Sequence, residues 1–158
     1  MYKAQVDDKG RLKLPVDFQT FFSGFPEKGR IYVTSLDGIT GQIYPISIWR
    51  QNQKRFARWK ENAGTVEKVM FNAQDFGSEV EMDSSGRITL STEMRDELQL
   101  AGQPVRLVVM KGRVEILSER VYDKRRRSAR PAEGEEVAEE KPRPQTENVR
   151  ILEEMGLL

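Results

Sequence analysis

The sequence predicts a mainly β fold with short helices, of the α+β class, built from two tandem copies of one small unit. Three observations predict it: a short pattern occurs twice, an amphipathic segment follows each copy, and two apolar runs follow each amphipathic segment. The pattern begins at Asp7 and again at Asp83, so equivalent positions are 83 − 7 = 76 residues apart. The identical pairs are Asp7 and Asp83, Gly10 and Gly86, Arg11 and Arg87, and Leu14 and Leu90.

Each pattern is predicted to form a strand that leads into a helix. Proline and serine favour helix starts and glycine favours helix ends, so the two helices should begin at Pro15 and Ser91 and end at Gly24 and Gly102. Apolar side chains recur on one helical face in both segments. These side chains are Phe18, Phe21, Phe22 and Phe25 in the first copy and Met94 and Leu98 in the second.

The next two apolar runs predict a β-hairpin in each copy, because they are rich in residues that suit a pleated surface and enclose a glycine-containing turn. The runs and turns are residues 31–33, 37–38 and 43–44 in the first copy and 105–109, 111–112 and 114–117 in the second.

Within the repeated pattern, the aspartate and the glycine favour structural roles. Gly10 and Gly86 are expected to meet a positive φ requirement. Asp7 and Asp83 are expected to accept local backbone N–H bonds in a turn, which we favour over a catalytic role.

Between the copies, residues 47–73 predict two helices. The first presents Trp49, Phe56 and Trp59 among many cations, and the second carries an apolar stripe after Gly64. A cation-rich helix with aromatic residues resembles a nucleic-acid binder. The alternative, which we favour, is that the aromatic residues form core or a subunit contact and the cations a solvated face.

After Asp123 the composition changes to a basic block, an acidic block and two prolines, which predicts a disordered tail over residues 124–158. The apolar end, residues 149–158, is too short to stay helical alone. The basic block is either a DNA-binding arm or a solvated charge run.

Composition narrows the function classes. The sequence has no cysteine and no histidine, which removes thiolate metal sites and the commonest neutral-pH acid–base group. We therefore expect no enzyme activity, no metal and no cofactor; an enzyme would need a carboxylate or lysine site, and no such pair stands out. No apolar run is long enough to cross a membrane and no signal-like N-terminus appears, so we expect a cytoplasmic protein.

The distribution of charge points to the first copy as the phosphate-facing one. The formal net charge is only +1, but residues 1–76 hold 12 Lys and Arg against 8 Asp and Glu, and residues 77–123 hold 6 against 9. Strand alternation places Lys9, Arg11 and Lys13 on one face and the leucines on the other. Extended strands that present cations can lie along a DNA groove.

Arg11 is the predicted principal DNA contact, supported by Lys3, Lys9 and Lys13, with Arg87 as the equivalent residue of the second copy. The alternative is that each arginine folds back onto the aspartate four residues before it. This alternative weighs more for Arg87, because the neighbouring pattern positions in the second copy are not basic.

The doubled Asp-x-x-Gly-Arg pattern, followed by Leu36-Asp37-Gly38 and by Tyr44-Pro45 with Trp49, resembles the MraZ family over residues 1 to 123. The resemblance implies a regulator of the bacterial division and cell-wall gene cluster, built from SpoVT/AbrB-like swapped-hairpin units that form a pseudo-dimeric barrel. It also implies a homo-oligomer, a ring, that binds repeated promoter elements. The chain departs from the family in a shorter N-terminus, in Ser91 where proline is usual, and in its long charged tail.

We therefore predict a sequence-specific DNA-binding repressor, cytoplasmic and nucleoid-associated, whose partners are double-stranded promoter DNA and further copies of itself, with no membrane or small-molecule substrate. The alternative is an oligomeric protein-interaction scaffold with incidental DNA contact. The predicted domains are a first SpoVT/AbrB-like repeat over 1–48, connecting helices over 49–76, a second repeat over 77–123 and the tail over 124–158.

Overall fold

The computed structural model describes residues 1–110 and 112–130, which form a mixed α and β fold with short helices. The strands are β1 (Tyr2–Gln5), β2 (Arg11–Lys13), β3 (Arg30–Thr34), β4 (Gly41–Pro45), β5 (Ser78–Glu81), β6 (Arg87–Thr89), β7 (Pro104–Met110) and β8 (Arg113–Ser118). The helices are α1 (Val16–Ser23), α2 (Ile46–Arg58), α3 (Ala63–Phe76), α4 (Thr92–Glu97) and α5 (Glu119–Ala129).

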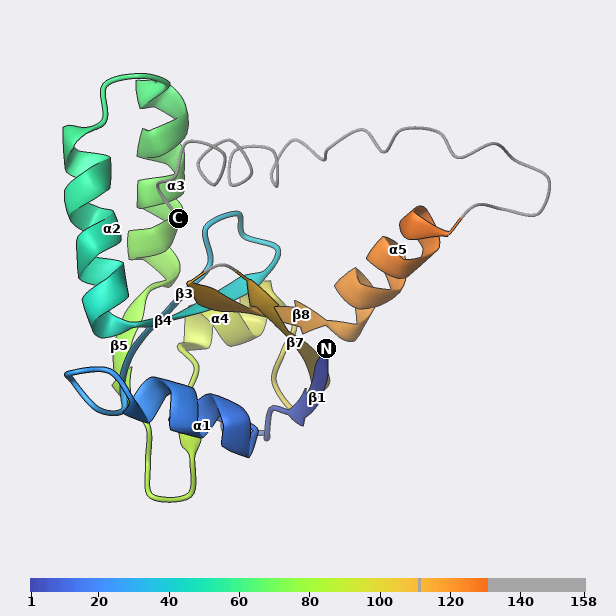
Figure 1. Cartoon of the computed structure of the whole chain (residues 1–158). Helices are drawn as coiled ribbons and strands as arrows, with labels where there is room; N and C mark the ends of the chain where they lie inside the picture. The colour runs from blue at the N-terminus through green and yellow to red at the C-terminus, as the bar shows by residue number, and fades with distance from the viewer. Residues whose placement is uncertain (111, 131–158) are drawn as a thin grey trace.

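The strands of the two copies are interleaved in one antiparallel sheet with the order β1-β7-β8-β4-β3-β5. β1 of the first copy pairs with β7 of the second, and β5 of the second copy pairs with β3 of the first. Exchanging each strand with its equivalent (β1 with β5, β3 with β7 and β4 with β8) gives the same order read in reverse, so the sheet has approximate twofold symmetry. Figure 1 shows the α2–α3 hairpin on one side of this sheet and α5 projecting from the other.

A separate two-stranded sheet, which we call the ribbon, joins β2 to β6, the strands that carry the two patterns. A single bridge between Val6 and Leu12 links the chain after β1 to the ribbon. The larger sheet ends at β1 and β5, and no pairing joins these edges within the described residues, so the expected closed barrel is not found. The chain leaves each short edge strand to enter the ribbon, and the ribbon strands pair with each other.

The main hydrophobic cluster lies under the ribbon and against α1 and α4. Leu12 and Ile88, which face each other across the ribbon, are 0% and 1% exposed. Phe18 and Phe22 of the predicted helical stripe are buried in this cluster, whereas Phe21 is 44% exposed. The apolar face of the ribbon therefore anchors both patterns to a shared core.

A second cluster packs α2 and α3 onto β3 and β4. Trp49 is buried and stacks on Tyr32 with ring centroids 4.5 Å apart, and Phe56 is buried beside it. Arg50 forms an ion pair with Glu27. Trp49 and Phe56 are therefore core, as the favoured alternative predicted, and Trp59 packs partly buried against the same cluster.

The two predicted helix starts agree with the structure, and one predicted end does not. Pro15 directly precedes α1, and the Ser91 side chain caps α4 by accepting a hydrogen bond from the Met94 backbone N–H at 3.3 Å. However, α4 ends at Glu97, well before Gly102, because the chain already turns into a left-handed conformation at Gln99, where φ is 55°.

The basic block after Asp123 also differs from expectation, because α5 extends through Ala129 and makes residues 124–129 helical. Its anchors include Val121, which is buried, Glu119, whose carboxylate lies 3.1 Å from Arg106 Nε of β7, and Arg125, whose Nη1 atom lies 3.5 Å from the buried carboxylate of Glu115. Residues 131–158, which include the rest of the predicted tail, lie outside the described residues.

Candidate nucleic-acid interface

The ribbon places the two repeated patterns side by side with their cations on one face. In its register Lys13 lies opposite Arg87, and Arg11 lies opposite Thr89. Cross-strand partners point to the same side of a sheet, so these side chains share the outer face while Leu12 and its partner are buried beneath. The alternation predicted from the sequence is therefore present, and it includes Arg87 in the same surface as Arg11.

The ribbon is held in register by reciprocal hydrogen bonds between the two copies. The Leu14 backbone N–H donates to the Gly86 carbonyl at 2.9 Å, and the equivalent Leu90 N–H donates to the Gly10 carbonyl at 2.8 Å. Both glycines adopt the left-handed conformation expected of them, with φ of 80° at Gly10 and 76° at Gly86. The two strands that carry the cations are therefore joined by backbone hydrogen bonds at both ends of the ribbon.

The aspartates cap the two turns, as predicted. Asp7 Oδ1 accepts the backbone N–H groups of Lys9 at 3.0 Å and Arg11 at 2.8 Å. Asp83 Oδ1 accepts those of Ser85 and Arg87, both at 2.9 Å. The bond from the Arg11 N–H is the largest cause that lowers the pKa of Asp7 below its ordinary value, and the bond from the Arg87 N–H is the largest cause for Asp83, in each case against a smaller opposing effect of burial.

The two pattern arginines differ in their contacts, in the reverse of the order that the sequence suggested. Arg11 folds back onto Asp7, with its Nε atom 2.7 Å from Asp7 Oδ2. In contrast, the guanidinium of Arg87 makes no ion pair within residues 1–110 and 112–130, although its backbone N–H bonds to Asp83. Arg87 is exposed, so its donors are available to a ligand.

The three predicted lysines are all exposed around the ribbon. Lys13 donates from Nζ to the Ser85 carbonyl in the turn of the second copy. Lys3, on β1, lines the same shallow hollow as Lys13, so the structure brings these two residues together. Lys9 lies in the turn of the first copy. The predicted site residues therefore lie along the ribbon, with Lys3 and Lys13 near the second turn and Lys9 at the first.

The sequence analysis missed Arg95. Its side chain lies across Gly10 of the other copy, so that a Cβ atom at Gly10 would overlap the Arg95 Cδ atom. Gln19 lies across Gly86 in the same way. Arg95 and Gln19 are equivalent positions of the two copies, since 95 − 19 = 76, but nothing in the sequence marks their contact with the glycines.

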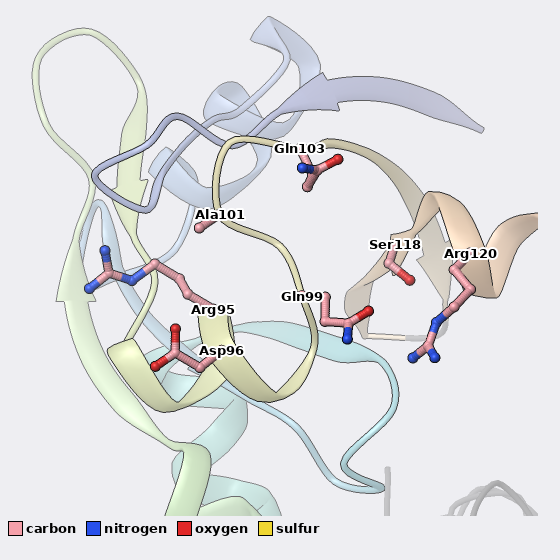
Figure 2. A pocket seen from close by; sticks show the side chains of 7 residues that line it. All are labelled: Arg95, Asp96, Gln99, Ala101, Gln103, Ser118 and Arg120. Carbon is pink, nitrogen blue, oxygen red and sulfur yellow. The ribbon is translucent and has the colours of Figure 1, made fainter.

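Arg95 also borders a polar hollow between α4, the loop that follows it, and the start of α5. Figure 2 shows Arg95 and Asp96 on one side of this hollow and Gln99, Ser118 and Arg120 on the other. Arg95 points away from the hollow and lies far from Arg120, so the two arginines do not converge on one small anion (Figure 2).

No group of acidic side chains in the described ranges could hold a metal ion. Likewise, none of the helices among these residues is long and apolar enough to span a membrane.

Comparison with known proteins adds to this geometry. No protein-family model matches the chain. The chain is 30% identical over 102 residues to the transcriptional regulator MraZ of Koribacter versatilis, which covers 65% of this chain and 69% of that protein. It is 32% identical over 104 residues to MraZ of Acidobacterium capsulatum, with 66% and 70% covered, and 23% identical over 143 residues to MraZ of Pseudoalteromonas translucida, with 90% and 92% covered. The chain therefore belongs to the MraZ family of transcriptional regulators.

Proposed function

We propose that this regulator binds double-stranded DNA through the outer face of the ribbon, with Lys9, Arg11, Lys13 and Arg87 as its contacts and Lys3 at its edge. The observation that carries the proposal is the ribbon register, which brings cations of both copies onto one rigid face. A two-stranded antiparallel ribbon fits the major groove of B-DNA. The lysines supply phosphate contacts, and an arginine can pair bidentately with guanine.

The fold supports this assignment at the level of the repeat. Interleaved strands and reciprocal hydrogen bonds between the copies fit two SpoVT/AbrB-like swapped-hairpin units that act as one pseudo-dimer. The domain division into residues 1–48, 49–76, 77–123 and a tail is part of the same proposal.

The protein acts as an oligomer on repeated promoter elements of the division and cell-wall gene cluster, as a repressor in the cytoplasm and on the nucleoid. A net charge of +1 gives a single subunit little general attraction to DNA, so tight binding requires several subunits on several elements. Large exposed apolar side chains support self-association, since Val16 is 72% exposed and Phe71 67% exposed. In the alternative scaffold function, these residues would bind other proteins and DNA contact would be incidental.

Footprinting on the DNA upstream of the gene that encodes this chain tests the proposal. The wild-type protein is expected to protect a repeated element, and the double variant Lys13→Ala/Arg87→Ala is expected to lose that protection while remaining folded. A charge-matched control, Lys54→Ala/Lys68→Ala, removes two exposed cations of α2 and α3. Binding without sequence preference, or equal loss in both double variants, would favour the scaffold function.

A further inference from the structure

We propose that Arg95, which belongs to the second copy, is a further phosphate-contacting residue at the pattern of the first copy. The DNA surface around Lys9 and Arg11 would then be built by both halves of the chain. This inference rests on the proposed DNA-binding function and adds one residue to the same surface.

The position of Arg95 follows from the missing side chain at Gly10. A Cβ atom at Gly10 would lie 2.5 Å from Nε and 2.7 Å from Nη1 of Arg95, closer than any real contact. The arginine therefore passes directly over this glycine. Because Gly10 is the residue between Lys9 and Arg11, the guanidinium lies at the turn that carries both proposed DNA contacts.

Gln19, the equivalent residue of the first copy, shows that covering the glycine of the turn does not require a charged side chain. Gln19 crosses Gly86 with its Cδ atom in the place that the Arg95 Cδ atom takes over Gly10. The amide of Gln19 then donates from Nε2 to the Leu14 carbonyl at 2.7 Å. A side chain that ends soon after Cδ is therefore long enough to cover the glycine, and the charged group of Arg95 is not needed for this packing.

The charged group of Arg95 also has few partners of its own. Its Nη2 atom donates to Thr92 Oγ1 at 2.9 Å, and its buried Nε atom has no hydrogen-bond partner. No ion pair joins Arg95 to a carboxylate in the part of the chain that the structure describes, although Asp96 lines the same hollow. A half-buried guanidinium with unused planar donors suits a phosphate, which accepts two parallel N–H bonds.

The consequence is an electrostatic difference between the two turns. The turn of the first copy gathers Lys9, Arg11 and Arg95, whereas the equivalent positions in the second copy are Ser85, Arg87 and Gln19. A ligand phosphate near the first turn would therefore meet Lys9 and Arg95, which the second turn lacks at the equivalent positions, whereas one near the second turn would meet Lys13, which reaches the Ser85 carbonyl.

Four proteins test the inference: wild type, Arg95→Gln, Arg95→Lys and Arg120→Gln. Each is titrated against a duplex from upstream of the gene that encodes this chain and against a scrambled duplex, at several salt concentrations. Arg95→Gln introduces the residue that already covers Gly86, so it keeps the packing and removes the charge. Arg120→Gln removes one charge from an exposed residue at the opposite side of the hollow in Figure 2 and serves as the matched control.

Arg95→Gln is expected to weaken binding to both duplexes by about tenfold per contact at 0.1 M monovalent salt, and to lower the slope of log affinity against log salt by about one. Arg95→Lys is expected to keep most of the affinity and the full slope. Arg120→Gln is expected to match the wild type.

An unchanged slope in Arg95→Gln, with wild-type binding intact, would overturn the inference and leave the proposed function standing. So would equal losses in Arg95→Lys and Arg95→Gln, since side-chain shape and not charge would then matter. If Arg95→Gln unfolds, Arg95→Met, which also extends past Cγ without a charge, takes its place; a lower slope then supports the contact, and an unchanged slope refutes it. Failure of the wild type to bind either duplex would instead refute the proposed function.

Discussion

Replacing Arg87 with alanine is expected to weaken specific DNA binding at least as much as replacing Arg11. Both side chains lie on the outer face of the ribbon, but only Arg11 is held by an aspartate, at 2.7 Å from Asp7. To contact a base, Arg11 must first give up this ion pair, whereas Arg87 has no ion pair to break among the described residues. The sequence alone suggested the opposite order, because the basic neighbours cluster around Arg11.

A bidentate contact between arginine and guanine contributes about 1–3 kcal/mol, or roughly a 5- to 150-fold change in affinity per subunit. Arg87→Ala is expected to lose this full amount. Arg11→Ala loses the same contact, but the loss in binding free energy is reduced by the cost of breaking the Arg11–Asp7 ion pair, which the wild type incurs on binding. That cost is small because both side chains are partly exposed to water.

Fluorescence anisotropy with operator and scrambled duplexes measures these losses, and circular dichroism checks that both variants fold. The reasoning is refuted if Arg87→Ala binds operator like the wild type while Arg11→Ala loses discrimination between the two duplexes. A loss shared equally by both duplexes would show that the arginines contact phosphate and not bases.

Three further predictions concern the turns and the target. The pKa values of Asp7 and Asp83 are lowered in the folded state, so these carboxylates stabilise the fold fully above their unfolded pKa of about 3.9. This stabilisation is lost as the pH falls through the folded pKa values. The variants Asp7→Asn and Asp83→Asn should therefore show a smaller decline in melting temperature below about pH 4 than the wild type. Gly10→Ala should lower the free energy of unfolding by more than about 1 kcal/mol, because φ is 80° at Gly10 and Arg95 fills the space that a Cβ atom would need. Gly64 lies in α3 with open space around it, so Gly64→Ala should raise the free energy of unfolding by about 0.5–1 kcal/mol. Urea unfolding of the two variants measures both changes. Finally, reversing one of two repeated DNA elements should weaken binding in footprinting titrations, since one subunit presents different cations at its two turns; equal affinity for both arrangements would argue against this asymmetry.

The residues that set local structure were well predicted from the sequence. The positive φ of Gly10 and Gly86, the capping role of Asp7 and the N-cap at Ser91 all depend on neighbours within a few positions, which a sequence pattern displays directly. The two-residue alternation also placed Leu12 in the core and its flanking cations outside.

Features that depend on pairing between the copies could not be read from the sequence. The contact between Arg95 and Gly10 exists only because the ribbon brings one copy against the other, and no local signal encodes it. The ion pair of Arg11 is local, but its absence at Arg87 shows that equal spacing does not fix a side-chain conformation.

Helix α5 was also not predicted from the sequence. The composition of its basic block predicts disorder because charged residues dominate it. However, the buried Val121, the ion pair of Arg125 with the buried Glu115 and the ion pair of Glu119 with Arg106 anchor the helix to the sheet. A few anchoring contacts of this kind are invisible in an average over a segment.

The approximate twofold symmetry of the backbone and the asymmetry of its charges have separate consequences for recognition. The symmetric frame, with equivalent bonds from Leu14 and Leu90, keeps both patterns at one geometry, so both can approach a groove in the same way. The unequal side chains on that frame give the two ends different sets of cations, with Lys9 and Arg95 at the first turn and Lys13 at the second. A true dimer of identical chains would present the same cations at both ends and favour a palindromic element. Duplication within one chain removes that constraint, so under the proposed DNA-binding function a single subunit would distinguish the direction of its DNA target.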